Sequence, residues 1–546
     1  MIRKCRLLWQ SLRSVLLFSL CVLLTVSCGR STPESASPSG QIVLGTTAVI
    51  STLDPADANT TFANNLLYNL GDRLYTYADD SADLVPQLAT SLPTISPDGL
   101  TYTIPLRQGV VFHDGTPFNA EAMAFSINRF IQNGGTPSYL MADVDTVKAT
   151  GEFELTIRLK QPFAAFPSLL AFSGLCAVSP QAYEIKEGAF KAREFVGTGA
   201  YTLASYGTDQ IRLVPFDRYW GSKPNNTGID IQIFSSPANL YNAFRTGAVD
   251  LAYQSLAIDQ IRNLQDNATS RGWQVITRQG SGIDYLTLNL NSPPLDQPAV
   301  RQAIAAVIDR TVLQDRVFMG QVDPLYSLIP STLPAQQPVF QTAFAPLTPG
   351  TANHPEVAKR LLTDAGFSLS NPAKIEFWYR SNLVNDQIAA ITLKAIAQRD
   401  LGGLLQFDLQ GIESTTAYKN LDQGAYPIFL LDWSPDFLDP DNFIQPFMEC
   451  TQGSPTTGCT DGSSALQGSF YYSDRANQWI RDSRQAQQPA QRNAIFAKLQ
   501  ALLVEDVPFI PLWQNRDFLF AQPQIQGARL QITQKVPFAP LQKSAS

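Results

Sequence analysis

Between Lys374 and Trp433 the sequence alternates between two hydrophobic periods, and this alternation restricts the possible folds more than any other feature. Three short runs have strand character, KIEFWY, LQFDLQ and PIFLLDW, and they are separated by helix-like segments near residues 386–400 and 414–421. Strands that alternate with helices are typical of a mostly parallel sheet covered by helices. The sequence therefore predicts an α/β fold.

The last of these strands leads directly into the segment Asp432-Trp433-Ser434-Pro435-Asp436. In open α/β sheets, ligands bind outside the carboxyl ends of the strands. We therefore expect an indole and a carboxylate at the edge of the sheet that faces a ligand. Two other interpretations stay open, since Asp436 can instead cap a helix or form a salt bridge and Trp433 can belong to the core.

A second β-α-β pattern precedes this region, with a strand at 229–234, a helix at 237–246 and a strand at 249–253. Another strand is predicted from Tyr285 to Leu290. The length of 546 residues allows about three or four domains. Two α/β lobes joined by extended segments indicate a cleft that closes by hinge motion.

Two helix starts are predicted from capping residues in the second half of the chain. We expect Asp296 to cap a helix, and Asn353 with Glu356 to form a capping box for a helix that ends at Gly366, with His354 in its first turn. The apolar face of the first helix is predicted to consist of Val300, Ile304, Val307 and Ile308.

A smaller α+β domain is predicted at 76–194. The segment FELTIRLK at 153–160 alternates apolar and polar residues, which indicates a half-exposed antiparallel strand. The segment from Tyr102 to Leu106 alternates likewise, and Pro105 within it predicts a position at the edge of a sheet. Asn119 is the expected N-cap of a following helix.

The amino terminus has the composition of an export signal. Residues 1–27 combine early cations with an apolar run from Val15 to Val26, which is shorter than the about 20 residues of a membrane-spanning helix. The segment Leu24-Thr25-Val26-Ser27-Cys28 resembles a bacterial lipobox, which predicts lipidation of Cys28. Residues 28–40 are rich in Ser, Pro and Gly, and we expect a flexible tether. The alternative is a cleaved secretory signal beside which Cys28 has no role.

The charge argues against nucleic acid as a partner. The chain has 40 Lys and Arg against 47 Asp and Glu, and removal of the four cations in residues 1–27 leaves 36 against 47, a net charge of −11. Such a surface repels phosphate backbones. Export also implies an oxidising compartment, so we predict a disulfide between Cys450 and Cys459, which flank a short polar loop, whereas Cys176 is expected to be buried.

Enzyme signatures are scarce in the sequence. It contains no P-loop, no His-Glu-x-x-His, no Cys-x-x-Cys and no Gly-x-Ser-x-Gly, and its two histidines, His113 and His354, are far apart. We therefore expect no metal site, no cofactor and no enzymatic activity. The one catalytic alternative is a secreted hydrolase that uses the acidic cluster Asp432, Asp436, Asp439 and Asp441, although such clusters are more often solvated loops or ion sites.

Seven segments are spread over nearly the whole mature chain: LDPA at Leu53, LVPQLATS at Leu84, DGLTYTIPLRQGVVFHDGTPFNAEAMAFSINR at Asp98, GTGAY at Gly197, LNLNSPPLDQPAVRQAIAAVIDR at Leu288, AKRLLTDAGF at Ala358 and DWSPDFLDPDNF at Asp432. Together, in this order, they resemble the extracytoplasmic solute-binding proteins of ABC importers, specifically the peptide/nickel class (bacterial family 5). Ala200 stands where the family often has Pro.

The resemblance implies a two-lobed, periplasmic-binding-protein-like (type II) fold with an additional small α+β domain. Lobe I would comprise residues 41–75, 195–283 and 505–546, lobe II residues 284–504, and the inserted domain residues 76–194. The chain would be a monomer outside the cytoplasm, held at a membrane through its lipid. It would deliver its ligand to permease subunits that work with cytoplasmic ATPases.

The resemblance also implies where a peptide would bind. In peptide-binding members an Asp three residues after a Trp pairs with the ligand's α-ammonium, and Asp436 and Trp433 have that spacing. Backbone groups at Asp432 to Ser434 would pair with the peptide, and the opposite lobe would contribute near Asn59 to Thr61. Other members bind metal chelates, haem, opines or oligosaccharides, and Trp433 with Trp513 could stack on a sugar; a chemosensory or adhesion role is a further alternative.

Overall fold

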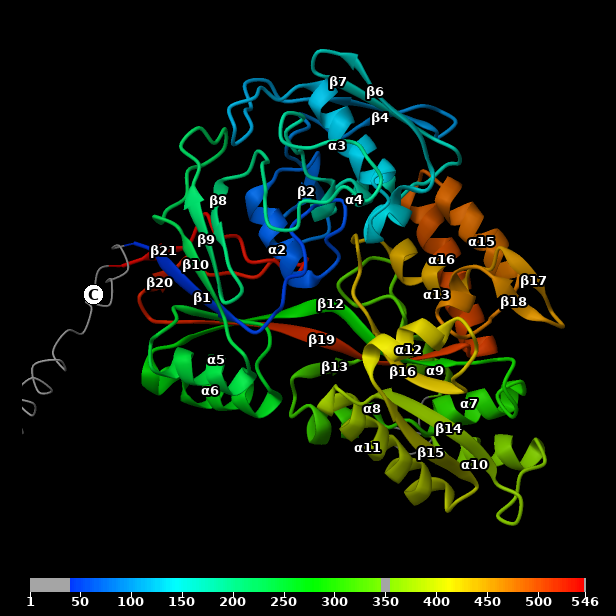
Figure 1. Ribbon diagram of the computed structural model, residues 1–546. Coiled ribbons are helices and arrows are strands. Elements are labelled where there is room, and N and C mark those ends of the chain that lie inside the picture. The colour runs from blue at the N-terminus through cyan, green and yellow to red at the C-terminus, as the bar shows by residue number, and fades with distance from the viewer. Residues whose placement is uncertain (1–39, 345–353, 545–546) are drawn as a thin grey trace, which may run out of the picture.

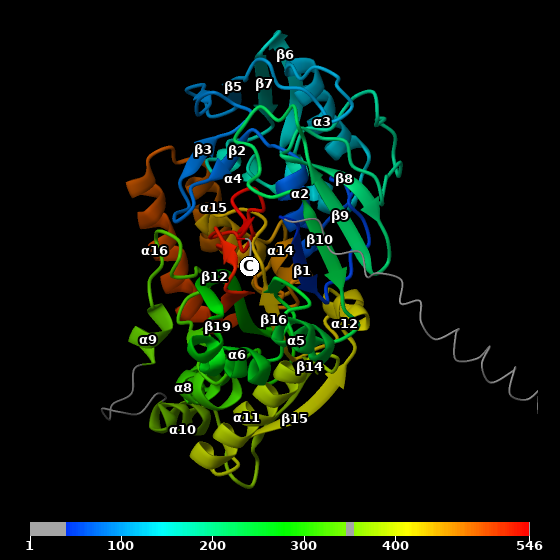
Figure 2. The ribbon, with the colours of Figure 1, turned by 90° about the vertical axis from the view of Figure 1, so that its left-hand side faces the viewer.

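The computed structural model describes residues 40–344 and 354–544 (Figure 1). The predictions about the export signal, Cys28 and Asn353 lie outside these residues, as does all of the tether except Gly40. Figures 1 and 2 agree in placing β6, β7 and α3 at one end of the molecule and α10, α11 and β15 at the other. One mixed sheet of eleven strands connects the parts, in the order β15-β14-β16-β12-β19-β11-β1-β10-β9-β8, with β13 paired to β19.

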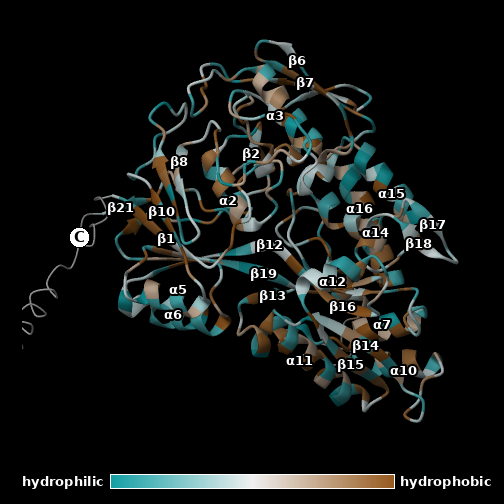
Figure 3. Ribbon diagram, viewed as in Figure 1, coloured by the Kyte–Doolittle hydropathy of each residue, from teal (hydrophilic) through white to brown (hydrophobic). Residues whose placement is uncertain are grey.

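The β1 half of this sheet contains the predicted β-α-β unit, with one addition. β10 (Ile229–Ile233), α5 (Pro237–Arg245) and β11 (Leu251–Tyr253) have the predicted order, but β1 (Ile42–Thr46) lies between the two strands and pairs in parallel with both. β9 (Gln210–Pro215) and β8 (Tyr201–Tyr206) extend the sheet outward, and α6 (Ile258–Arg271) follows β11. In Figure 3, α6 is mostly hydrophilic, as expected for a helix at the surface.

Two long antiparallel strands, β12 (Gln274–Leu288) and β19 (Phe509–Ala521), connect the two halves of the sheet. Their pairing is interrupted between Gln279 and Ile283, where the chain reads Gly280-Ser281-Gly282. A Cβ at Gly280 would lie only 2.8 Å from a carboxylate oxygen of Asp517, so no side chain fits at this position without a rearrangement. The irregularity turns Ser281 out of the regular ladder in the middle of the sheet.

The β16 half of the sheet confirms the alternation of strands and helices. β14 (Ala373–Arg380), α11 (Val384–Leu401), β15 (Leu405–Ile412), α12 (Ser414–Leu421) and β16 (Ile428–Trp433) follow in the predicted order, and β14 pairs in parallel with β15 and β16. Other elements of this part of the chain are α7 (Pro298–Val307), α8 (Arg310–Val312), β13 (Val322–Pro324), α9 (Val339–Ala343), α10 (Pro355–Asp364), α13 (Gln445–Met448), α14 (Ser463–Leu466), α15 (Asp474–Gln485) and α16 (Pro489–Asp506).

The small α+β unit is a four-stranded sheet, β4-β5-β7-β6, with α3 (Ala120–Gln132) packed on it. Asn119 caps α3 through its side chain, and β7 (Glu154–Leu159) alternates buried and accessible residues, so both predictions are confirmed. The edge position of β5 (Thr101–Pro105) is wrong, because β5 lies between β4 (Thr94–Ile95) and β7. Pro105 is tolerated there because β4 pairs only with Tyr102 and Thr103; the remaining elements are β2 (Tyr75–Tyr77), β3 (Leu84–Pro86), β6 (Val144–Gly151) and α4 (Phe166–Leu169).

Two predicted caps are not as expected. The N-cap of α7 is Gln297 and not Asp296, and the N-cap of α10 is His354, which lies outside the first turn. Both helices have Pro at their first position, whose fixed φ sets the helix start independently of a capping side chain. The predicted apolar face of α7 is correct, since Val300, Ile304, Val307 and Ile308 are all buried.

The cores and the disulfide complete the architecture. The small α+β unit and the β16 half share one hydrophobic cluster, whereas the β1 half has clusters of its own. The predicted disulfide joins Cys450 and Cys459 beside the hairpin of β17 (Gln452–Ser454) and β18 (Gly458–Asp461), and Cys176 is buried and free. None of the helices in the described part of the chain is both long and apolar enough to span a membrane.

Candidate functional site

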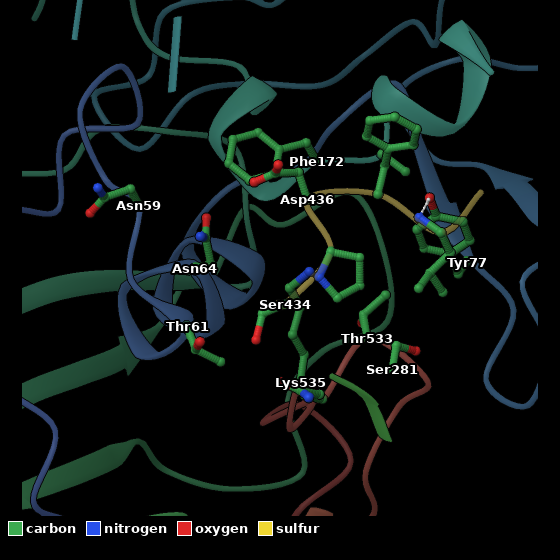
Figure 4. A pocket seen from close by; sticks show the side chains of 15 residues that line it. Asn59, Thr61, Asn64, Tyr77, Phe172, Ser281, Ser434, Asp436, Thr533 and Lys535 are labelled. Carbon is green, nitrogen blue, oxygen red and sulfur yellow. Dashed lines mark hydrogen bonds between the residues drawn. The ribbon is translucent and has the colours of Figure 1, made fainter. Parts of the chain in front are cut away.

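A small cavity of about 90 Å³ lies where several separate parts of the chain meet (Figure 4). It adjoins the start of α2 (Thr61–Leu70), the irregular part of β12, the segment that follows β16, and a segment near the carboxyl terminus. Its polar lining residues are Asn59, Thr61, Asn64, Tyr77, Ser281, Ser434, Asp436, Thr533, Gln534 and Lys535. The predicted residues Asn59, Thr61, Ser434 and Asp436 therefore line the same cavity.

The segment after β16 is positioned by its neighbours in the sheet. β16 pairs with β12 as far as Trp433, opposite Ile283, which is where the irregular part of β12 begins. Beyond that point the chain leaves the sheet, and the backbone N–H of Asp436 donates to Oδ1 of Asn442 at 3.0 Å. The N–H of Leu438 donates to the Tyr77 hydroxyl at 2.9 Å, so the small α+β unit fixes the far end of the segment.

The carboxylate of Asp436 has no cationic partner among the residues that the structure describes. The hydroxyl of Tyr139 donates to its Oδ2 at 3.0 Å. Burial raises the pKa of Asp436 to about 6, while the hydrogen bonds from Tyr139 and Asn442 oppose that shift. A half-buried carboxylate without a cation is ready to bind a positively charged group, because such a group would offset its desolvation.

Trp433 lies on a second, larger cavity that meets the first at Asp436 and Phe437. This outer cavity has a volume of about 510 Å³, and Tyr139, Asp143 and Arg484 also line it. The indole packs edge-on against Phe447, with ring centroids 5.6 Å apart, and its Nε1–H has no hydrogen-bond partner within the described part of the chain. Trp433 therefore carries an unused donor beside the cavity.

The opposite wall is formed by the start of α2, which Thr60 caps through its side chain. Asn64, one turn into the helix, lines the small cavity, and its buried Oδ1 accepts no hydrogen bond from residues 40–344 or 354–544. A buried acceptor without a partner costs free energy unless a donor reaches it. Together with Asp436, Asn64 makes this side of the cavity suitable for a ligand that brings N–H groups.

The third wall carries a cation. Lys535 lines the cavity next to Thr533 and Gln534, and it forms no ion pair with a carboxylate of the described residues. Its ammonium lies 6.0 Å from the ring centroid of Tyr68. Burial lowers the pKa of Lys535 to about 7, and the neighbouring charge of Arg73 contributes in the same direction.

The other members of the predicted acidic cluster have cationic partners. Asp432 pairs with Arg380, Asp439 with Arg492 at 2.7 Å, and Asp441 with Arg484 at 2.9 Å. These carboxylates serve the structure, so the cluster is not arranged as a pair of catalytic acids. The side chain of Asp432 is likewise occupied by Arg380 and does not line either cavity.

Trp513 is not placed to contact a ligand in the way the sequence suggested. It lies within β19, is only 3% exposed and packs on Phe318 with ring centroids 4.5 Å apart. It borders neither cavity, and stacking of a sugar between Trp433 and Trp513 is therefore excluded in this conformation.

Several residues of the site were not predicted, among them Tyr139, Asn64 and Lys535. Tyr139 lies in a short 3₁₀ segment (Thr136–Met141), far in sequence from Asp436. The one sequence signal for Lys535 is a lysine directly before the apolar residues Val536 and Phe538. No group of three or more His, Cys, Asp or Glu in the described ranges is arranged to hold a metal ion.

The chain is similar to proteins of known class along most of its length. The sequence model for bacterial extracellular solute-binding proteins, family 5 (middle), matches residues 83–455. The probable D,D-dipeptide-binding periplasmic protein DdpA of Escherichia coli K12 is 27% identical over 511 residues, which cover 90% of this chain and 92% of that protein. The glutathione-binding protein GsiB of Escherichia coli K12 is 25% identical over 484 residues, 86% of this chain and 88% of that protein.

The fold agrees with these sequence relationships. The periplasmic binding protein DppA of Helicobacter pylori, solved in complex with the peptide STSA, superimposes with a TM-score of 0.73 at 22% identity, over 93% of this chain and 98% of that one. The similarity confirms the predicted two-lobed type II fold. The chain belongs to the bacterial extracellular solute-binding proteins of family 5.

Proposed function

We propose that this protein is the substrate-binding component of an ABC importer for short peptides, and that it holds the peptide's α-ammonium at Asp436. The observation that carries the proposal is a carboxylate without a cationic partner among the described residues, at the junction of two cavities and three residues after Trp433, where β16 ends. DdpA and GsiB are named for binding a dipeptide and glutathione, which supports a peptide-like ligand.

The contribution of Asp436 follows from its surroundings. A hydrogen bond between an ammonium and a carboxylate contributes about 1.5–3 kcal/mol. Because the Asp436 backbone is held by Asn442 and the next residues by Tyr77, the carboxylate is oriented before the ligand arrives. The ligand would recover the free energy that burial of the carboxylate costs.

Free backbone groups on β16 would supply the rest of the recognition. β14 pairs with β16 only at Ile428 and Phe429, so the edge of β16 that leads to Trp433 is not covered by β14. A peptide that pairs with this edge and with Ser434 would be recognised through its backbone, whatever its side chains. Water in the outer cavity would accommodate different side chains.

We also propose the finer organisation that this role requires. The lobes would have the boundaries 41–75, 195–283 and 505–546 for lobe I and 284–504 for lobe II, with 76–194 inserted. Cys28 would be lipidated after removal of residues 1–27, which would hold a monomer at the outer face of a membrane or in the periplasm beside the permease. A binding protein of this kind returns its ligand chemically unchanged.

The substitution Asp436→Asn tests the proposal directly. Calorimetry with di-, tri- and tetra-alanine should show affinities weaker by about one to two orders of magnitude, corresponding to the lost charge-assisted bond. The N-acetylated forms of the same peptides should be affected much less. Asp422→Asn, at an exposed position after α12, is the matched control and should change neither series.

Two results would reject the proposal. Equal losses for free and acetylated peptides would show that Asp436 does not bind the α-ammonium. Mass spectrometry that finds the alanine peptides hydrolysed after incubation with the wild-type protein would show that the protein is not a simple binding protein.

A further inference from the structure

We propose that Arg484 is a latch that holds the small α+β unit against the β16 half, so that part of the population stays in this closed arrangement even without a ligand. Arg484 lies in the last turn of α15 and lines the outer cavity. The inference goes beyond the proposed function, because it concerns a contact between two parts of the chain and does not depend on which ligand binds.

The small α+β unit is joined to the β1 half by a fully paired, buried contact. Arg129 in α3 donates from Nη1 and Nη2 to the two carboxylate oxygens of Asp54, at 2.8 and 2.7 Å. Asp54 lies between β1 and α2, and the side chains of Arg129 and Asp54 are 2% and 0% exposed. The backbone N–H of Lys191 donates to the same carboxylate at 2.6 Å. Because a buried ion pair is costly to break, we expect this contact to persist when the protein opens.

The contact between the small α+β unit and the β16 half is packed less completely, because it contains the outer cavity of about 510 Å³. Tyr139, Asp143 and Phe163 of the small unit line this cavity together with Trp433 and Phe437. The rings of Phe163 and Phe437 meet edge-on across the boundary, with centroids 6.1 Å apart. Protein interiors are normally close-packed, so a boundary that contains such a space has fewer contacts to lose. The two parts would therefore separate here.

Arg484 bridges this boundary in three ways. Its guanidinium carbon lies 4.8 Å from the ring centroid of Phe163, and its Nη1 lies 3.9 Å from Oδ2 of Asp143. Its backbone carbonyl accepts a hydrogen bond from the N–H of Ala164 at 2.8 Å. On its own side of the boundary, the guanidinium pairs with the buried Asp441 at 2.9 Å. Asp441 therefore keeps the guanidinium in position, ready to contact the small unit.

The strength of these contacts suits a latch that can open. A guanidinium stacked on an aromatic ring, together with a long ion pair, corresponds to a change of about three- to tenfold in the ratio of closed to open molecules. A contribution of this size shifts an equilibrium between two conformations without excluding either of them. A ligand would then have to supply only the remaining free energy of closure.

The double variant Asp143→Asn and Phe163→Leu tests the latch from the side of the small unit and leaves the pair of Arg484 with Asp441 intact. Spin labels on cysteines introduced at two exposed positions, Glu121 in α3 and Gln478 in α15, report the separation of the two parts by pulsed electron paramagnetic resonance. The chain without the introduced cysteines gives the background.

We expect the ligand-free wild-type protein to populate both the short separation of this structure and a longer one. The double variant should lower the ratio of short to long by about three- to tenfold. Asp145→Asn is the matched control and should leave the ratio unchanged, because Asp145 is half-exposed and pairs with Arg158 inside the small unit at 3.7 Å.

Urea denaturation distinguishes a latch from a general loss of stability. If the double variant lowers the free energy of unfolding, Asp143→Asn alone decides, because an Asn side chain can keep the hydrogen bond that Gln161 donates at 2.7 Å. A smaller closed fraction with unchanged unfolding supports the latch. A ligand-free wild-type protein without the short separation, or variants with the wild-type ratio, would overturn it. Failure of the alanine peptides to bind would reject the proposed function and would not alter these ratios.

Discussion

Two groups of charges lie at opposite ends of the short segment from Asp432 to Asp436, and they are arranged in opposite ways. In the Arg380 cluster, which comprises Arg380, Asp386, Asp432 and Asp284, the guanidinium contacts Asp386 at 2.8 Å and Asp432, while Asn515 donates to Asp284 at 2.9 Å. In the cavity, Asp436 and Lys535 have no ionic partner among the described residues.

The difference indicates which acidic residue can serve a ligand. In the Arg380 cluster the protein itself supplies the counter-charge, and burial together with the nearby charges of Asp432 and Asp386 raises the pKa of Asp284 well above its usual value. Removal of the cation would leave buried carboxylates without compensation. In the cavity, by contrast, none of the described cations pairs with Asp436, so the proposed ligand would supply the partner.

The largest predicted effect is on the Arg380 cluster. Arg380→Met should lower the free energy of unfolding by about 3–5 kcal/mol, because it removes one partner from a buried ionic network. Urea denaturation measures the change. Arg475→Met provides the control, since the Arg475–Glu505 pair is exposed and should contribute little. Comparable stabilities for the two variants would show that Arg380 does not compensate the buried carboxylates of the cluster.

The second prediction concerns the free energy of unfolding that is lost by burying the Asp436 carboxylate. Because the pKa of Asp436 rises from 3.8 to about 6 on folding, the folded protein binds this proton more tightly than the unfolded chain. The ionised carboxylate therefore lowers the free energy of unfolding above pH 6. Below pH 4 the group is protonated in the folded and the unfolded protein, and this cost disappears. Asp436→Asn should stabilise the ligand-free protein by about 1–2 kcal/mol at pH 8, after allowance for partial solvent screening.

Urea denaturation at pH 8 and at pH 4 tests this cost, since the gain should shrink at the lower pH. Asp441→Asn is the contrasting variant and should destabilise the protein, because Asp441 is buried and paired with Arg484. If Asp436→Asn were destabilising at pH 8, Asp436 would have a structural partner, and the contrast between the two regions would disappear.

The third prediction is a loss of peptide affinity at acidic pH. Asp436 must be ionised to bind an ammonium, and its pKa is about 6. The affinity for Ala-Ala should therefore fall below pH 6, by up to about tenfold per pH unit.

Calorimetry from about pH 4.5 to about pH 8.5 measures this acidic limb. Asp436→Asn should lose the limb. The peptide's own amino group titrates higher, near pH 8, and its effect should persist in the variant. An affinity that is constant from about pH 5 to about pH 7 would contradict the assignment of the ammonium site to Asp436.

The order of the main elements was predictable because hydrophobic period is a local property. The strands and helices from β14 to β16 follow from apolar spacing alone, as does the buried face of α7. The exact starts of α7 and α10 were missed because a Pro at the first helical position sets the start without help from a capping side chain.

The site was predictable only in part, because charge compensation depends on tertiary contacts. Asp432, Asp436, Asp439 and Asp441 are alike in the sequence, yet three of them acquire an Arg from a distant segment and Asp436 does not. Lys535 was not predicted for the same reason, because only the structure shows that it has no acidic neighbour among the described residues. Trp513 was predicted to contact a ligand, because the sequence does not indicate whether the ring of an aromatic residue on a strand is covered by other side chains.

The smallest predicted effect concerns Tyr139, whose hydroxyl donates to Asp436 and so favours the ionised carboxylate. Tyr139→Phe removes this bond, so the pKa of Asp436 should rise further and the acidic limb of the affinity profile should move to higher pH. The displacement should be less than about one pH unit, as expected for a single hydrogen bond. Tyr418→Phe is the matched control, because its hydroxyl contacts Arg380 at 3.1 Å and belongs to the other region. A limb that moves with Tyr418→Phe, or that stays in place with Tyr139→Phe, would show that the two regions titrate together and that the acidic limb does not belong to Asp436 alone.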